Sequence, residues 1–251
     1  MNKNVAVLSF GVLAVLGCRG KEPSGFITFQ VSARPDGATA DSVPPTGVVA
    51  LGKDTIILQR VRMVLAELAI APSEAQECEE EEGEDNPPCV EFDEHPVVIE
   101  LPLDRPVAFR STLPAPVTSY NLFQAVLHPV TLEDDSALVR GNPDVTGASV
   151  LVEGIVSRAG KRTPFSFSSD FAETEEITLE PALTVAKGDS LHVTLRVDVA
   201  SWFKNEDGTT LIDPASAGPG GKNQHLVRDH IRTSISAFSD QNGDGQPDTQ
   251  P

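Results

Sequence analysis

The chain is poor in aromatic side chains and in positive charge. Of its 251 residues 5% are aromatic, with one Trp and one Tyr, and 19 Lys and Arg stand against 37 Asp and Glu, for a formal net charge of −18 at pH 7. Nucleic-acid phosphates are bound by Lys and Arg, and unpaired bases stack on exposed aromatic rings. The composition therefore predicts that no nucleic acid is a partner.

Sequence signatures of several enzyme classes are also missing. The chain contains neither an HExxH zinc motif nor a GxSxG nucleophile elbow. Residues 217–222 resemble a phosphate-binding loop superficially, but Ser216 and Asn223 stand where that loop needs Gly and Ser or Thr. No two His residues have i, i+4 spacing, and we expect surface or core roles for His95, His128, His192, His225 and His230. We therefore expect no catalytic residues. A carboxylate pair for glycoside hydrolysis stays open as an alternative, because acidic residues are abundant.

The N-terminus has the pattern of an export signal. No apolar run reaches the roughly 20 residues of a membrane-spanning helix. Residues 2–4 include one Lys, and ten of the twelve residues from Val5 to Leu16 are Ala, Val, Leu or Phe, which suits the apolar part of a signal peptide. The stretch ends in Gly17-Cys18 and resembles the lipobox of bacterial lipoproteins, in which the Cys receives a lipid and becomes the new N-terminus. We predict a signal peptide over 1–17 and lipidation of Cys18. The alternative is an ordinary secretory signal with an incidental buried Cys.

A lipid on Cys18 would anchor the protein to a membrane without spanning it, with residues 18–25 as the tether. Arg19 follows the Cys, and by resemblance to Gram-negative lipoproteins the lack of Asp at this position favours the outer membrane. We therefore expect a location in the cell envelope, facing the periplasm or the surface. The expected partners are the membrane, through the lipid, and an envelope protein or glycan.

Two further cysteines remain for pairing. Cys78 and Cys89 form an even pair, which in an oxidising compartment indicates a disulfide. It would close a twelve-residue loop that holds six carboxylates, with a stabilisation of roughly 3 kcal/mol on the chain-entropy model. A zinc site is the alternative, although CxxC spacing and nearby His are missing. The acidic run itself is expected to be a solvated loop, with weak attraction of calcium as an alternative.

Alternating apolar and polar residues predict a mainly β fold. The segment 54–71 is ambiguous, because it opens with β-branched residues but Ala66–Ala69 have helix propensity; we expect one long strand. Many short strands at similar spacing favour an antiparallel β-sandwich, immunoglobulin- or transthyretin-like, over residues 26–200. The strands are predicted at 25–32, 54–71, 97–101, 107–111, 120–130, 149–157, 163–169, 176–180 and 191–199.

Residues 201–251 are expected to form a C-terminal extension packed on the same domain. Asn223 is predicted to cap a short helix over 225–238. The neighbouring Trp202 and Phe203 are expected to plug the end of the sandwich, and the alternative is that they face a sugar or peptide.

A calcium-type loop follows the predicted helix. Oxygen-bearing side chains stand at positions 1, 3 and 5 of the segment that begins at Asp240, and Gly245 at position 6 permits a sharp turn. The predicted ligands are Asp240, Asn242, Asp244, the backbone carbonyl of Gln246, and Asp248 directly or through water.

This loop departs from an EF-hand, because Pro251 stands where the bidentate Glu would be. It resembles the loops of dockerins and thrombospondin type 3 repeats. A site with few ligands predicts weak calcium binding, in the range of roughly 10⁻⁴–10⁻³ M. The alternative is an acidic, Gly-rich tail that only resists aggregation.

Several blocks together resemble a known group of proteins. The blocks are 59–65 with the acidic Cys-bracketed loop and 97–103, then 195–203 with 211–214, then 231–248. They are similar to uncharacterised bacterial lipoproteins related to a domain-of-unknown-function family with an immunoglobulin- or transthyretin-like sandwich. Tyr120 stands where such proteins often have a Pro-Ala-Gly-Thr-Tyr run, but here the Gly is missing. The resemblance implies a sandwich fold and brings no known activity.

These observations predict a non-catalytic binding or structural module of the cell envelope with a weak calcium site. An envelope polysaccharide hydrolase is the alternative. A transport accessory role fits the same observations as the module.

Overall fold

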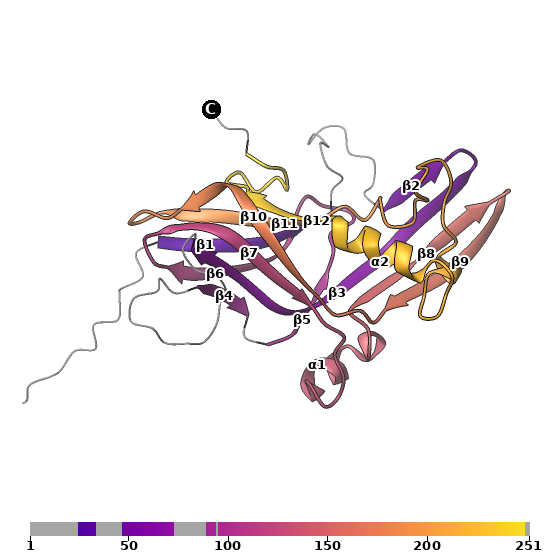
Figure 1. The fold of residues 1–251 in the computed structure, drawn as a ribbon, viewed down its shortest axis with the longest axis horizontal. Helices are drawn as coiled ribbons and strands as arrows, with labels where there is room; N and C mark the ends of the chain where they lie inside the picture. Colours follow the sequence, from indigo (N-terminus) through magenta and orange to yellow (C-terminus); the bar gives the residue numbers. More distant parts are fainter. Residues whose placement is uncertain (1–24, 34–46, 73–88, 94, 249–251) are drawn as a thin grey trace, which may run out of the picture.

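The protein folds into two packed β-sheets, as the mainly β prediction requires (Figure 1). The computed structural model describes residues 25–33, 47–72, 89–93 and 95–248. Most neighbouring strands in these ranges are antiparallel, and helices are few and short. The fold class is therefore that of a β-sandwich.

The smaller sheet has the strand order β12-β11-β1-β6. Its strands are β12 (Ile235–Ser239), β11 (Ser190–Val197), β1 (Gly25–Ser32) and β6 (Ala108–Ala115). β1 and β11 pair in parallel, whereas β6 and β12 run antiparallel to their neighbours. Because β1 is central, it lies between a strand from the middle of the chain and one from its last quarter. In this register Gln30 stands beside both Thr194 and Arg110.

The larger sheet is organised around one long strand, β3 (Asp54–Pro72). β3 pairs with five other strands and shifts register at irregular positions, which lets it bend along the molecule. The ambiguity over 54–71 is thus resolved in favour of a strand. The path β10-β7-β3-β8-β9 uses β10 (Glu173–Thr184), β7 (Ser119–Leu127), β8 (Val150–Arg158) and β9 (Lys161–Ser169). Three short strands pair with β3 beside this path, namely β2 (Val48–Leu51), β4 (Val90–Asp93) and β5 (Val97–Glu100). β2 and β4 were not predicted.

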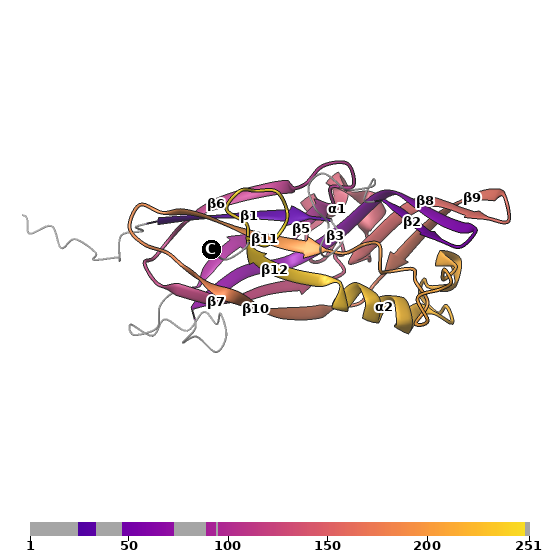
Figure 2. The same cartoon turned by 90° about the horizontal axis from the view of Figure 1, so that it is seen from above.

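The helices lie at the margins of the sandwich (Figures 1 and 2). They are α1 (Ser136–Gly141), the 3-10 turns η1 (Pro143–Val145) and η2 (Pro214–Ser216), and α2 (Gln224–Thr233). Asp135 caps α1, because its carboxylate accepts the backbone N–H groups of Ala137 and Leu138.

The predicted helix over 225–238 is wrong in its second half. α2 ends at Thr233, and residues 235–239 form β12, which pairs with β11. A helical stripe and a strand alternation are hard to tell apart over so few residues, and pairing with the edge of β11 decides the outcome. The predicted cap is also wrong in detail: Asn223 occupies the N-cap position, but its side chain donates to Ser216 Oγ at 2.8 Å.

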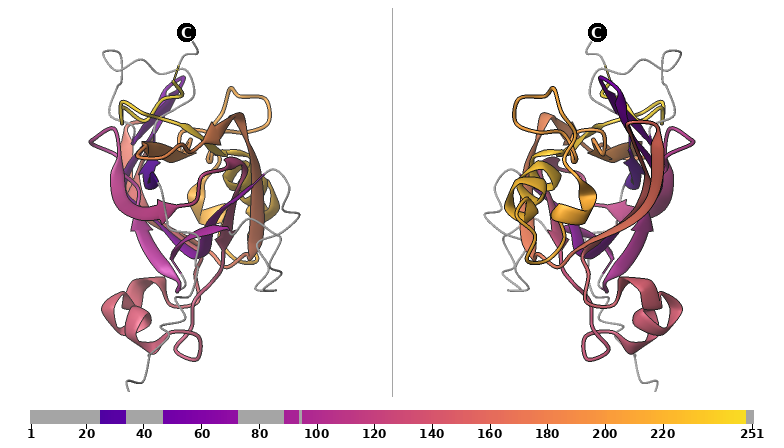
Figure 3. Two further views of the ribbon diagram at one scale, coloured as in Figure 1. Left: turned by 90° about the vertical axis from the view of Figure 1, so that its left-hand side faces the viewer. Right: turned by 90° about the vertical axis from the view of Figure 1, so that its right-hand side faces the viewer.

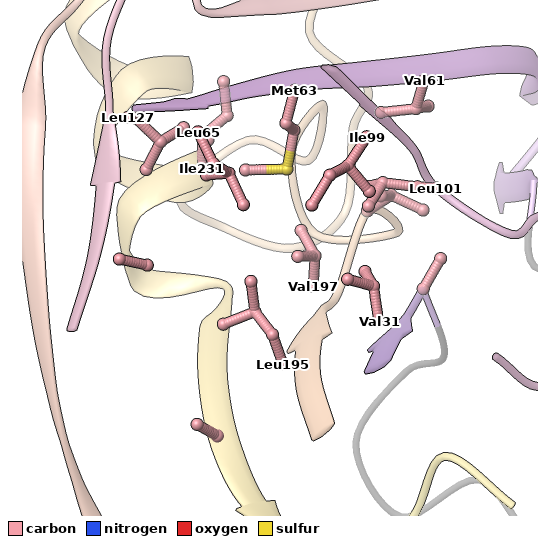
Figure 4. Close-up of a cluster of buried hydrophobic side chains, with 14 of the residues drawn as sticks. Val31, Val61, Met63, Leu65, Ile99, Leu101, Leu127, Leu195, Val197 and Ile231 are labelled. Atoms are coloured by element: carbon pink, nitrogen blue, oxygen red, sulfur yellow. The ribbon is translucent and has the colours of Figure 1, made fainter. Parts of the chain in front are cut away.

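The hydrophobic core lies between the two sheets and is closed by α2 (Figure 4). Side chains from β1, β3, β5, β7, β11 and α2 converge there, as the close-up shows for Val31, Val61, Met63, Leu65, Ile99, Leu127, Leu195 and Ile231. Trp202 and Phe203 are fully buried in the same core, and Trp202 Nε1 donates to Ser234 Oγ at 2.8 Å. They plug the sandwich as predicted, and the sugar-facing alternative is wrong.

A second, small cluster covers the outer face of β3. Val64 packs there with Val130, Val139, Val145 and Leu151 beneath α1 and η1, which project from one side of the sandwich (Figure 3). In the described part of the chain, no helix is both long and apolar enough to cross a membrane.

Candidate functional site

Part of the predicted site lies outside the described residues. Cys18 with its signal peptide and Cys78 fall in the ranges 1–24 and 73–88. Cys89 is half-buried directly before β4. Lipidation of Cys18 and the pairing of Cys78 with Cys89 therefore stay predictions.

The predicted calcium loop folds back over the outer face of the smaller sheet. After β12 the chain turns above β1 and β11 (Figure 2). The loop 240–248 is closed at its base, because the backbone N–H of Asp248 donates to the carbonyl of Ser239 at 3.1 Å. The Asp248 carboxylate accepts Gln241 N–H at 2.8 Å and Ser239 Oγ–H at 3.1 Å. Asp248 is thus engaged in closing the loop.

Asp240 joins this loop to the sheet. It is fully buried, and its Oδ2 accepts hydrogen bonds from Gln30 Nε2 of β1 and Thr194 Oγ1 of β11, each at 2.8 Å. The same oxygen accepts Gly245 N–H at 2.8 Å, and Oδ1 accepts Asp244 N–H at 3.0 Å. One carboxylate therefore connects two strands with the turn of the loop.

The turn is held by short-range bonds from side-chain oxygens to backbone N–H groups. Asn242 Oδ1 accepts Asp244 N–H at 3.0 Å, and Asp244 Oδ1 accepts Gln246 N–H at 2.8 Å. Gly243 and Gly245 have φ values of +67° and +79°, a left-handed conformation that glycine adopts at little cost. A Cβ on Gly245 would stand 2.7 Å from Ser32 Oγ and 2.9 Å from the carbonyl oxygen of Pro106, so the loop needs glycine there for space as well.

The structure brings three of the five predicted ligands into one network. Oδ1 of each of Asp240, Asn242 and Asp244 accepts a single hydrogen bond, and a second lone pair stays available on each. An all-oxygen donor set of this kind suits calcium. Within the described ranges, no three His, Cys, Asp or Glu side chains gather to hold a metal ion. Backbone oxygens and water would have to supply the remaining ligands, and the donor set fits only a weak site.

The polar outer face of the smaller sheet is a feature that the sequence analysis missed. Thr28, Gln30 and Ser32 alternate with the core-facing residues of β1, yet all three are buried. Thr194 and Arg196 continue this polar face on β11, and the Arg196 guanidinium lies 5.1 Å from the centre of the Phe238 ring. When a strand is buried on both faces and one of those faces is polar, another segment must cover the polar face. Here the cover is the loop 240–248.

A pair of carboxylates lies on the opposite sheet. Burial, with a smaller contribution from the charge of Glu91, raises the pKa of Glu67 above its ordinary value. Gln124 Nε2 donates to Glu67 Oε1 at 3.2 Å. Burial and the neighbouring Glu91 therefore account for the raised pKa, and the hydrolase alternative stays a prediction.

An ion-pair cluster fastens η1 to β3. Arg62 is buried, pairs with Asp144, and donates to Asn142 Oδ1 at 3.0 Å. Arg60 reaches Asp144 at 3.2 Å and Glu100 at 3.3 Å. Although burial opposes the effect, the hydrogen bond and charge of Arg62, with the charge of Arg60, leave the pKa of Asp144 below its usual value. These ion pairs hold η1 against the sheet, so the cluster has a structural role.

Comparisons with protein-family models, with curated proteins and with solved structures find no match to this chain. The resemblance to lipoproteins with an immunoglobulin- or transthyretin-like sandwich therefore stays a prediction.

Proposed function

We propose that the protein is a lipid-anchored component of the cell envelope whose sandwich serves as a non-catalytic binding or structural module. The observation that carries this proposal is the N-terminal sequence, in which a single Lys, an apolar run and Gly17-Cys18 follow in the order of a lipoprotein signal. The first strand begins at Gly25, seven residues after Cys18, which is consistent with a short tether between lipid and fold.

The proposal includes a weak calcium site in the loop 240–248. It is supported by the spacing of Asp240, Asn242 and Asp244 and by the lone pairs that their Oδ1 atoms retain. Calcium bound there would join neighbouring turns of the loop and stiffen the cover of the smaller sheet. Because Asp240 already connects the loop to β1 and β11, calcium would add to an existing closure.

Lipidation is tested on the protein isolated from its native membrane. Mass spectrometry is expected to find the chain beginning at Cys18, with acyl chains on that residue. A Cys18→Ser variant is the matched control and is expected to lose the acyl mass and to leave the detergent phase on phase partition. An unprocessed chain that retains Met1 without a fatty acid would refute the proposal.

Calcium binding is tested by thermal unfolding of the mature chain in chelator and in about 10 mM calcium. A dissociation constant near 1 mM predicts a stabilisation of about 1.4 kcal/mol at that concentration. The Asp244→Ala variant removes a ligand and is expected to show no shift. An unchanged midpoint for the unsubstituted chain would remove calcium from the proposal and leave the lipid anchor untouched.

A further inference from the structure

Three segments of the sandwich meet at the end where the chain enters the fold. They are the start of β1 at Gly25 and Phe26, the β6–β7 turn at 116–118, and the β10–β11 loop at 185–189. Phe26 N–H donates to the carbonyl of Asp189 at 2.9 Å, and Val185 N–H donates to the carbonyl of Thr118 at 2.9 Å. Figure 1 shows this end at the left of the molecule, opposite the β8–β9 hairpin. We refer to these three segments as the entry end.

The entry end exposes two large apolar side chains. Phe26 is 52% exposed and Val117 is 57% exposed. In the described ranges, two other large apolar side chains are exposed, namely Val48 at 39% and Leu132 at 56%. Val48 lies on β2 and Leu132 lies in the turn before α1. Single apolar residues on a surface need no explanation, but two on neighbouring segments at one end suggest a contact. Lys187, in the third segment, is exposed beside them.

The length of the tether places this end near the lipid. Gly25 is the seventh residue after Cys18, and a fully extended chain over these seven steps reaches about 25 Å. Acyl chains on Cys18 hold their residue at the bilayer surface. The tether joins the sandwich at the entry end, which therefore lies within this reach of the anchor, and Phe26 follows the last tether residue directly.

Resting on the proposed lipidation of Cys18, we infer that the entry end contacts the bilayer surface through Phe26 and Val117. A phenylalanine ring and an aliphatic side chain lose water contact at the boundary between headgroups and acyl chains. The contact is apolar in origin because Phe26 and Val117 carry no charge, whereas the chain as a whole carries a net charge of −18. Its partner is therefore a zwitterionic lipid surface, and acidic lipids would be repelled.

The test uses the acylated full-length mature chain in phosphatidylcholine vesicles, with part of the lipid brominated near the headgroup end of its acyl chains. The single natural Trp202 is fully buried and supplies a constant background. Trp is introduced separately by Val117→Trp and by Lys187→Trp, which probe two segments of the entry end. The matched control is Leu132→Trp, because Leu132 is 56% exposed but lies in the turn before α1.

The expected result is a blue shift and a loss of emission in brominated vesicles for the two entry-end variants, with none for the control. Two variants keep the test valid if one substitution impairs folding, which unfolding midpoints reveal. An acylated chain whose entry-end variants behave like Leu132→Trp would overturn the docking inference and leave the lipoprotein proposal standing. A chain without acyl groups overturns both.

Discussion

Replacing Asp240 by Ala tests whether this side chain connects the C-terminal loop to the sandwich. The substitution removes the acceptor of the Gly245 N–H and one of the partners of Gln30 Nε2 and Thr194 Oγ1. A buried donor left without a partner costs about 1–3 kcal/mol. Gln30 Nε2 keeps its bond to Thr194 Oγ1, which limits the loss at that site. We therefore expect the free energy of unfolding to fall by about 3–5 kcal/mol, near the upper end for single substitutions.

The assay is urea and thermal unfolding of the mature chain in chelator, so that bound calcium plays no part. For a chain of this size the expected loss corresponds to a melting temperature lower by roughly 10 °C. Asp244→Ala is the matched control in the same loop. Asp244 accepts local hydrogen bonds from Gln246 N–H and Asn242 Nδ2 and makes none to the sheet. Its loss is expected to cost about 1 kcal/mol or less in chelator.

The two variants together separate anchoring from metal binding. If Asp240→Ala destabilises the chain no more than Asp244→Ala does, the loop does not depend on its buried carboxylate and the reasoning is wrong. A normal stability of Asp240→Ala in chelator, with a loss only in calcium, would instead make the metal the main anchor.

Three further predictions concern individual side chains. Tyr120 is buried, its hydroxyl donates to a main-chain carbonyl at 3.2 Å, and burial raises its pKa to about 12. Tyr120→Phe should cost about 1 kcal/mol at neutral pH. The folded chain holds the phenol proton more tightly than the unfolded chain does. The free energy of unfolding should therefore fall as the pH rises from about 10 to about 12. Unfolding curves recorded over that range should show no such loss for Tyr120→Phe. Burial raises the pKa of Glu175. The charge of Glu173 adds to this increase, although the charge of Arg232 opposes it. Glu175→Gln should therefore stabilise the chain at neutral pH, and a pH series of urea midpoints should show the gain vanishing as the pH falls through that raised pKa; a gain that persists in acid would contradict the assignment. Gly245→Ala should destabilise the chain more than Gly188→Ala in thermal melts. Both glycines have positive φ, but only a Cβ at Gly245 would stand under 3 Å from other atoms, so equal losses would contradict the close approach.

The local pattern of the sequence was sufficient for most strands. β1 was predicted with the bounds that the structure has, because its alternation of Phe, Ile and Val with Thr and Gln needs no distant information. The long strand over 54–71 could be inferred from β-branched residues, even though its helix-forming centre pointed the other way. The calcium-type turn was also visible, because its oxygens and glycines stand within nine residues of one another.

The tertiary structure alone decided the roles that depend on distant partners. Residues 235–239 form a strand because the edge of β11 is available for pairing, and their own pattern does not distinguish strand from helix. Asp240 is predicted as a metal ligand, which stays a prediction, whereas its bonds to Gln30 and Thr194, 210 and 46 residues away in the chain, show that it anchors the loop. Periodicity reports which side of an element avoids water, whereas the identity of the covering segment depends on long-range packing. The burial of Gln30 on the outer face of β1 therefore emerges only when the chain has folded back on itself.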